Sequence, residues 1–95
     1  MPTAFVASYG SGTPVVAILA EYDALPGLSQ DDSTTKNLIT NKTSGHACGH
    51  HLFGAGSVAV GIDIKKQIEK GKIKGTIKVF GCPAEEGASG KVYMV

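Results

Sequence analysis

Val15-Val16-Ala17-Ile18-Leu19-Ala20 is a run of six apolar residues with no polar interruption. A run of this length and β-branched content is typical of a strand buried on both faces, as in an α/β sheet. Glu21-Tyr22-Asp23 follows directly and puts two carboxylates at the carboxyl end of the strand. Open α/β sheets place their chemistry at that end. The run therefore predicts an α/β fold and a candidate site where the strand stops.

Two further segments complete a strand–helix–strand unit. Residues 51–70 carry apolar side chains with helical spacing, end in several lysines and meet Gly71, a natural helix stop. The glycines inside this helix are expected to allow close packing on a sheet; they are Gly54, Gly56 and Gly61. The β-branched residues 76–80 predict a second strand. We therefore expect an α/β fold with a partial mixed or parallel sheet built on a βαβ unit.

The segments around this unit are less regular. Residues 4–9 are β-prone and are expected to pair with residues 15–20 as a hairpin across the turn at residues 10–14. Residues 28–45 are polar and predict a surface loop. The chain opens almost directly in a strand and stops early in another element, so we expect a fragment of a larger protein.

The composition argues against a nucleic-acid-binding protein and against a membrane-spanning protein. The 95 residues suffice for one small domain, and their apolar fraction of 42% is ordinary for a globular chain. A formal net charge of +1 and the lack of a basic, aromatic-rich stripe argue against a nucleic-acid partner. No apolar run is long enough for a membrane span, and no signal peptide is evident, so a reducing cytoplasmic location is expected. Cys82 is expected to be a small buried apolar residue.

All three histidines and one of the two cysteines lie in Gly45-His46-Ala47-Cys48-Gly49-His50-His51-Leu52. Imidazole nitrogen and thiolate sulfur are strong donors for zinc-like cations. Cys48 and His50 stand at the start of the expected helix, whose positive pole lowers a thiol pKa and favours the thiolate. The density of donors favours a metal site over a buried cysteine beside a hydrogen-bonded histidine. Further ligands must come from elsewhere in the chain.

Pro83-Ala84-Glu85-Glu86-Gly87 brings two adjacent carboxylates to the far end of the second strand. Neighbours on an extended chain point in opposite directions, so one carboxylate can bind a metal while the other faces a substrate water. Such a dipeptide is commonly an exposed acidic pair, but the strand before it and its flanking turn residues favour a site. Asp23 either orients a ligand or forms the turn that follows it, and its spacing leaves both open.

Three motifs in order resemble the M20 metallopeptidase family, in its branch of aminobenzoyl-glutamate hydrolase-like amidohydrolases. They are Ala20-Glu21-Tyr22-Asp23-Ala24-Leu25-Pro26-Gly27, Gly45-His46-Ala47-Cys48-Gly49-His50 and Pro83-Ala84-Glu85-Glu86-Gly87. The resemblance implies that residues 1–95 are part of a di-metal, aminopeptidase-like catalytic domain, without its lid domain and C-terminal part.

The resemblance also implies roles for single residues. The implied metal ligands are Cys48, His50 and Glu86. Glu85 corresponds to the general base, and Asp23 to an acidic residue that supports the metal site. His51 departs from the family pattern, because many relatives carry Asp or Asn at that position.

The implied cofactors are two divalent metal ions, zinc or manganese. The implied reaction is hydrolysis of an amide or peptide bond in a small-molecule substrate, an N-acyl amino acid or a dipeptide. The full-length protein is expected to form a homodimer, and these residues alone are expected to be inactive because downstream histidine ligands are missing. Two alternatives stay open. One is a non-catalytic module that holds a single ion, and the other is a hydrolase with Cys48 as its nucleophile.

Overall fold

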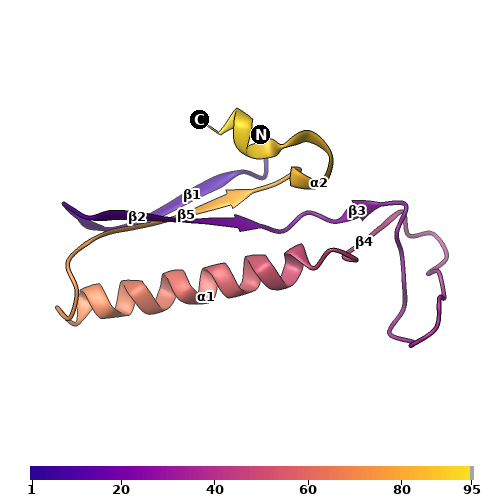
Figure 1. The fold of residues 1–95 in the computed structure, drawn as a ribbon, viewed down its shortest axis with the longest axis horizontal. Helices are drawn as coiled ribbons and strands as arrows, with labels where there is room; N and C mark the ends of the chain where they lie inside the picture. Colours follow the sequence, from indigo (N-terminus) through magenta and orange to yellow (C-terminus); the bar gives the residue numbers. More distant parts are fainter. Residues whose placement is uncertain (95) are drawn as a thin grey trace.

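A three-stranded mixed sheet and one long helix form the body of the computed structural model, which describes residues 1–94 (Figure 1). Strands β1 (Phe5–Ser11), β2 (Val15–Glu21) and β5 (Gly75–Cys82) form the sheet in the order β1-β5-β2. Helix α1 (His50–Glu69) connects β2 to β5 and lies along one face of the sheet. Because β2 pairs parallel with β5, the predicted α/β class and βαβ unit are confirmed.

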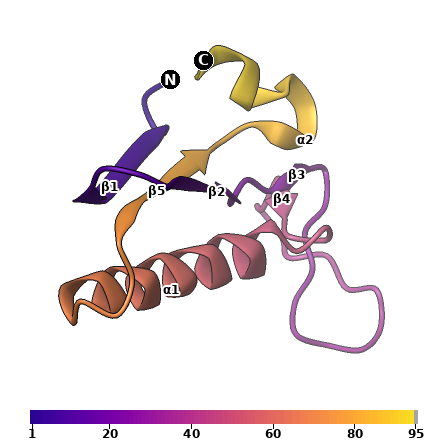
Figure 2. The ribbon, with the colours of Figure 1, turned by 60° about the vertical axis from the view of Figure 1, so that its left-hand side comes forward.

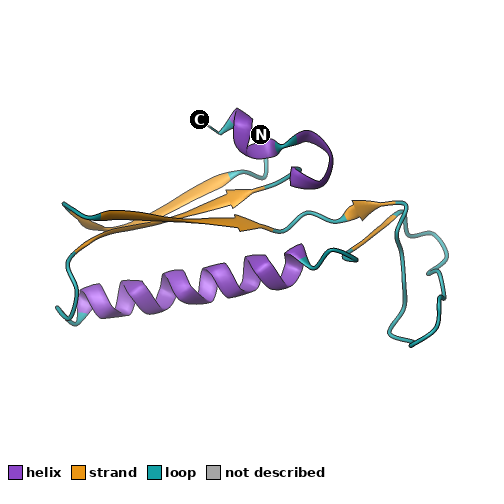
Figure 3. Ribbon diagram, viewed as in Figure 1, coloured by secondary structure: helices purple, strands orange, loops and turns teal. Residues whose placement is uncertain are grey.

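The remaining elements are short. Strands β3 (Leu25–Pro26) and β4 (Ser44–Gly45) pair antiparallel, and the predicted polar loop between them projects from the body (Figures 1 and 3). Helix α2 (Glu85–Ala88) and the 3-10 helix η1 (Gly90–Tyr93) follow β5 and turn back toward the N-terminus (Figure 2). Among the described helices, none has the length and apolar character needed to cross a membrane.

The hairpin expected between residues 4–9 and 15–20 is wrong. Strand β5 lies between the two segments and pairs antiparallel with β1, with Phe5 opposite Gly81 and Ser11 opposite Gly75. Seven residue pairs join β5 to β1, and seven join it to β2. The central position satisfies the backbone groups along both edges of β5, whereas a hairpin would leave β5 with one unpaired edge.

The burial expected on both faces of residues 15–20 is also wrong for the described chain. Ala20 lies on the side that faces α1 and is 1% exposed. Val15 and Leu19 alternate with it on the opposite face and are 55% and 47% exposed. The physical reason is that one helix covers only one face of the sheet, and β2 is an edge strand. Cys82 agrees with its prediction, because it is 1% exposed and its thiol is free.

Small residues on α1 let the helix approach the sheet closely. The buried positions of the helix are Gly54, Ser57 and Gly61. A methyl group added at Gly61 would lie 2.6 Å from the Cγ2 atom of Val79 on β5, so only a hydrogen atom fits there. The predicted packing role is therefore confirmed for Gly61. It is wrong for Gly56, where an added methyl group would meet nothing within 4 Å.

We expect Gly61→Ala to lower the free energy of unfolding by about 1–3 kcal/mol, because the added methyl group overpacks the contact with Val79. Gly56→Ala is the matched control and should raise it by about 0.5–1 kcal/mol, because alanine is the better helix former. Chemical denaturation of the protein that carries this chain measures both. Equal effects of the two substitutions would contradict the packing argument.

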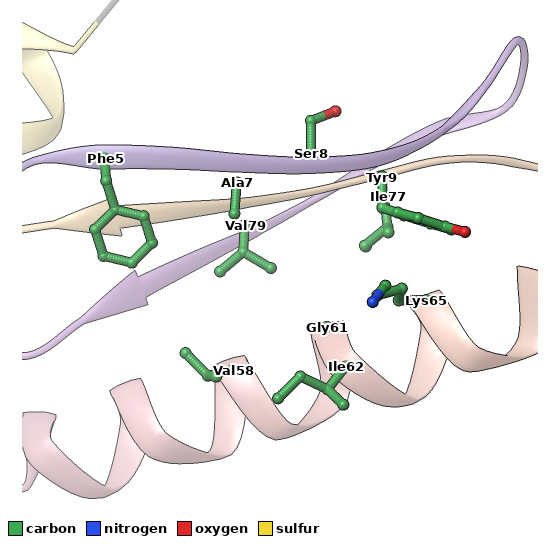
Figure 4. A pocket seen from close by; sticks show the side chains of 10 residues that line it. All are labelled: Phe5, Ala7, Ser8, Tyr9, Val58, Gly61, Ile62, Lys65, Ile77 and Val79. Atoms are coloured by element: carbon green, nitrogen blue, oxygen red, sulfur yellow. The ribbon is translucent and has the colours of Figure 1, made fainter. Parts of the chain in front are cut away.

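A cavity of about 400 Å³ lies between the sheet and the middle of α1 (Figure 4). Apolar side chains of β1, β5 and α1 form most of its wall, among them Phe5, Val79 and Ile62. The Lys65 ammonium closes one side, 5.2 Å from the ring centroid of Tyr9. None of the histidines, cysteines or glutamates lines this cavity, so we interpret it as a feature of sheet–helix packing.

Candidate metal centre

The candidate site forms where β2 and β5 end. These strands are parallel neighbours with Glu21 opposite Cys82, so their carboxyl ends meet at one edge of the sheet. Asp23 follows β2, and Glu86 lies in α2 just after β5. The start of α1 contributes His50, and Cys48 lies two residues before it. The topology thus gathers three segments that are far apart in the sequence.

Two residues with left-handed backbone turn the chain at this edge. Gly49 is the N-cap of α1 and has φ of 99°, a conformation that suits glycine, and it separates Cys48 from His50. Ala84 has φ of 60°, which costs a non-glycine residue about 1–2 kcal/mol, and it directly precedes α2. Backbone strain of this kind clusters at functional sites.

The extended backbone expected for Glu85 and Glu86 is wrong, because the turn at Ala84 makes them the first two residues of α2. Their carboxylates nevertheless have different partners. The Glu86 carboxylate lies beside His50, with its Oε1 3.5 Å from the histidine Nδ1. The Glu85 Oε1 accepts a hydrogen bond of 2.6 Å from the backbone N–H of Lys91.

The structure brings the side chains of Cys48, His50 and Glu86 together, with one ligand atom from each within 4.8 Å of the others. Ligand atoms on a tetrahedral zinc ion, with bonds of about 2.0–2.3 Å, lie roughly 3.3–3.8 Å from one another. The three donors would have to approach one another by up to about 1 Å to close around an ion. The Glu86 Oε1 is buried and has no hydrogen-bond partner among the described residues. A buried carboxylate oxygen without a hydrogen-bond donor is a suitable ligand for a cation.

Asp23 fixes two members of this cluster at once. Its Oδ1 lies 2.8 Å from the His50 Nδ1, and its Oδ2 accepts a 2.8 Å hydrogen bond from the backbone N–H of Glu86. Burial alone would raise the Asp23 pKa, but these two hydrogen bonds outweigh it and hold the pKa below its ordinary value. Because Asp23 holds Nδ1, Nε2 is the nitrogen of this ring that would bind a metal, and a carboxylate on the other nitrogen is the usual support for a metal-binding histidine.

A carboxylate also faces the other nitrogen of His50. The Oε2 atom of Glu21 lies 2.8 Å from the His50 Nε2. The hydrogen bond to Asp23, followed by the charges of Glu21 and Glu86, raises the pKa of His50. A cation bound to Nε2 would therefore have the Glu21 carboxylate beside it.

The lowered thiol pKa expected for Cys48 at the helix start is wrong. The Glu86 carboxylate accepts a hydrogen bond from the thiol, and this bond and the surrounding negative charges raise the Cys48 pKa. The effect of these carboxylates on the thiol pKa outweighs that of the positive pole of the helix. A thiol held in its neutral form is a poor nucleophile. This environment argues against the alternative in which Cys48 attacks the substrate.

A lysine joins Glu85 to the cluster of candidate metal ligands. The Lys91 ammonium lies 3.2 Å from the Glu85 Oε1 and also pairs with Glu21. Burial disfavours the charged ammonium, but the hydrogen bonds to Glu21 and Glu85 outweigh this and raise the Lys91 pKa. One charged network thus runs from Glu85 through Lys91 and Glu21 to His50.

The chain is similar over its whole length to known hydrolases. It is 48% identical over 96 residues to a subunit of p-aminobenzoyl-glutamate hydrolase from Escherichia coli strain K12. It is 34% identical over 104 residues to Xaa-Arg dipeptidase of Mus musculus. Over 79 residues, 81% of the chain, it is 35% identical to N-acetylcysteine deacetylase of Bacillus subtilis strain 168. All three relatives are M20 proteins. The chain belongs to the M20 family.

This M20 chain spans about a fifth of the length of those relatives: 20% of the first two and 19% of the third. No protein-family model matches it, and no solved structure matches it. The resemblance drawn from its three motifs is confirmed by these relatives. The roles of single residues rest on the geometry of the site.

Two members of the site in this M20 chain had no role predicted from the sequence, Glu21 and Lys91. The spacing of Glu21 and Asp23 put both carboxylates on one side of a strand end, which was the available signal for Glu21. Lys91 had no comparable signal, because only the turn through α2 and η1 brings it back to Glu21. His46 and His51 lie outside the ligand cluster formed by the described residues.

Asp23→Asn is expected to weaken divalent-metal binding by about 10–100-fold, because it removes the charged partner that orients His50. Competition with a chromophoric chelator, in the full-length protein, measures the affinity. Asp31→Asn is the matched control, since Asp31 is also hydrogen-bonded, to Ser33 and Asn37, but lies in the exposed loop. An unchanged affinity in Asp23→Asn would refute the orienting role.

Proposed function

We propose that the protein carrying this chain is a metal-dependent amidohydrolase that cleaves the amide bond of small N-acyl amino acids or dipeptides. The observation that carries the proposal is the convergence of Cys48, His50 and Glu86 beside a second, fixed carboxylate, Glu85. A sulfur, a nitrogen and an oxygen donor suit zinc, and the carboxylates also admit manganese. We propose a pair of such ions, with the remaining ligands supplied from outside residues 1–95.

Divalent metal bound at this site would polarise the amide carbonyl and lower the pKa of a water molecule. The residues of the chain would do the rest. Glu85 would accept the proton of the attacking water and return it to the nitrogen of the leaving amine. Lys91 holds the Glu85 Oε1 by its backbone N–H and its ammonium, which leaves Oε2 for the proton. Asp23 keeps the His50 ring in a fixed orientation.

The relatives support this reaction class. Their names describe a hydrolase of p-aminobenzoyl-glutamate, a dipeptidase and a deacetylase of N-acetylcysteine. The chain covers only 19–20% of each of them, so we propose the activity for the whole protein. The predicted homodimer belongs to the same proposal, and light scattering of the full-length protein tests it.

A chelation experiment tests the proposed function. The full-length protein is stripped with a chelator and assayed on an N-acyl amino acid, then reloaded separately with zinc and with manganese. We expect hydrolysis to disappear on chelation and to return with at least one of these metals. Persistent hydrolysis after complete metal removal would overturn the proposal.

The same samples separate the two alternatives. A single tightly held ion without turnover on any amide would favour the non-catalytic module. Activity that survives chelation but is lost on thiol alkylation would favour Cys48 as a nucleophile. The raised pKa of the Cys48 thiol argues against this nucleophile.

A further inference from the structure

The turn that carries Glu85 has little regular structure of its own. Helix α2 is only four residues long, and non-glycine residues with left-handed backbone stand on both sides of it, Ala84 with φ of 60° and Ser89 with φ of 48°. A backbone hydrogen bond from the Ala88 N–H to the Ala84 carbonyl oxygen closes it. A helix this short is not stable by itself, so contacts with other elements must hold the Glu85 carboxylate in place.

The end of β2 supplies two such contacts. The Asp23 Oδ2 accepts the 2.8 Å hydrogen bond from the Glu86 N–H, which fixes the backbone at the start of α2. Glu21, the last residue of β2, pairs with the ammonium of Lys91 in η1, the element that folds back after α2 (Figure 2). Carboxylates at the end of β2 therefore hold the turn from Glu85 to Lys91 on both sides of the proposed base.

Lys91 binds one oxygen of Glu85 with two donors. Its backbone N–H donates the 2.6 Å hydrogen bond to the Glu85 Oε1, and its ammonium lies 3.2 Å from the same atom. The side chains of Lys91, Glu21 and Glu85 are 31%, 19% and 15% exposed, so water and salt screen these pairs less than pairs on an open surface. The lysine stem is flexible, and the ammonium can hold Glu85 only where a second partner fixes it. Glu21 is that partner.

We infer that Glu21 and Lys91 form a positioning pair for the general base Glu85. Glu21 fixes the Lys91 ammonium, and the ammonium fixes the Glu85 Oε1, which keeps Oε2 free for the proton of the attacking water. Both residues act through Glu85. The inference rests on the proposed amide hydrolysis, and it gives a function to two residues that lie outside the cluster of candidate metal ligands.

Substitution of the lysine tests the pair in the metal-saturated, full-length protein. Lys91→Met keeps the backbone N–H and the aliphatic stem and removes the ammonium. We expect kcat to fall roughly 10–100-fold, because a displacement of about 1 Å costs a reacting group that much, while KM for an N-acyl amino acid stays within a factor of about two. Lys91→Arg, whose guanidinium can donate to both carboxylates, should recover part of kcat. A raised KM with unchanged kcat would overturn the inference.

Chemical rescue separates positioning from a mere loss of folded protein. Lys91 is 31% exposed, so a small cation can enter the space that Lys91→Ala leaves. Ethylammonium should raise kcat of this variant in a saturable manner, and ethanol, which is uncharged and of similar size, should not. Thermal unfolding and metal content are measured for every variant. A kcat that neither Lys91→Arg nor ethylammonium raises would overturn the inference.

Glu21→Gln tests whether Glu21 acts through the lysine. Glu21 also lies beside His50, so kcat is compared at saturating metal. The substitution should lower kcat in the wild-type background and change it by less than about twofold in Lys91→Met, because a residue that acts through another has no effect once the other is gone. Independent losses that multiply would refute the pair.

The ion pair between Lys65 and Glu69 provides the matched control. Its nitrogen and oxygen lie 3.3 Å apart, close to the distance between Lys91 and Glu85, but it lies on the exposed side of α1. Lys65→Met and Glu69→Gln, alone or together, should leave kcat unchanged.

Failure of the pair differs from failure of the proposed function. If the metal-loaded wild-type protein hydrolyses no amide, the proposed function fails. Hydrogen exchange tests the pair without turnover, because loss of the ammonium should loosen the turn. We expect Lys91→Met to speed exchange of the Lys91 amide by roughly tenfold or more relative to Lys65→Met. Equal exchange in the two variants would refute the positioning role even in an active enzyme.

Discussion

Glu85→Gln should reduce kcat by about 10²–10⁴-fold, the range expected when a general acid–base group is removed. Glutamine keeps the shape of the side chain and an oxygen for the Lys91 N–H, which Glu85 binds at 2.6 Å. It cannot accept the proton of the attacking water. Glu85 lies outside the ligand cluster of Cys48, His50 and Glu86, so bound metal should be unchanged. Steady-state kinetics and elemental analysis on the same preparation measure both quantities.

Glu69→Gln is the matched control for this substitution. Glu69 lies at the end of α1, is 42% exposed and pairs only with Lys65 one helical turn away. Surface pairs of this kind contribute little to stability, so activity and metal content should both be unaffected. If Glu85→Gln retained full activity with full metal content, another group would be the base. If it lost metal together with activity, Glu85 would be a ligand.

Cys48→Ala and His50→Ala should each abolish tight metal binding and, with it, hydrolysis. Each substitution removes one of the three donors that converge here, so the loss should exceed the roughly 10–100-fold effect of an outer hydrogen-bonding partner such as Asp23. Cobalt(II) provides a direct readout, because a thiolate ligand gives it a charge-transfer absorption. We expect this band in the wild-type protein and not in Cys48→Ala.

Cys82→Ala is the control for the cysteine substitution. Cys82 is also a free thiol, but it is buried in the sheet and its sulfur contacts the Phe80 carbonyl oxygen. We expect this variant to keep the cobalt band and metal affinity, with some loss of stability from the smaller side chain. A cobalt band that disappears with Cys82 instead of Cys48 would show that the sulfur ligand is not Cys48.

Local patterns carried much of the fold. The helical spacing of residues 51–70 matches α1 to within one residue at each end, because an amphipathic period and a glycine stop are local properties. Residues 76–80 lie within β5, as predicted, because the strand preference of β-branched residues is also a local property. The pairing of strands was not local. The turn at residues 10–14 suggested a hairpin, yet the backbone groups on both edges of β5 decided that this strand lies between β1 and β2.

The site divides in the same way. Residue types and their clustering selected Cys48, His50, Glu85 and Glu86 from the sequence, because few side chains can bind zinc or move a proton near neutral pH. The pKa shifts of these residues could not be predicted in the same way. The Cys48 pKa is raised and not lowered because three-dimensional packing places the Glu86 carboxylate against the sulfur.

The sequence by itself determined the α/β class, the βαβ unit and the candidate donors, since these follow from periodicity and from the chemistry of each side chain. Only the tertiary structure decided the strand order and the link from Glu85 through Lys91 and Glu21 to His50. Hydrogen bonds and ion pairs act over a few ångströms, and residues that are 63 or 70 positions apart come within that range only after the chain has folded.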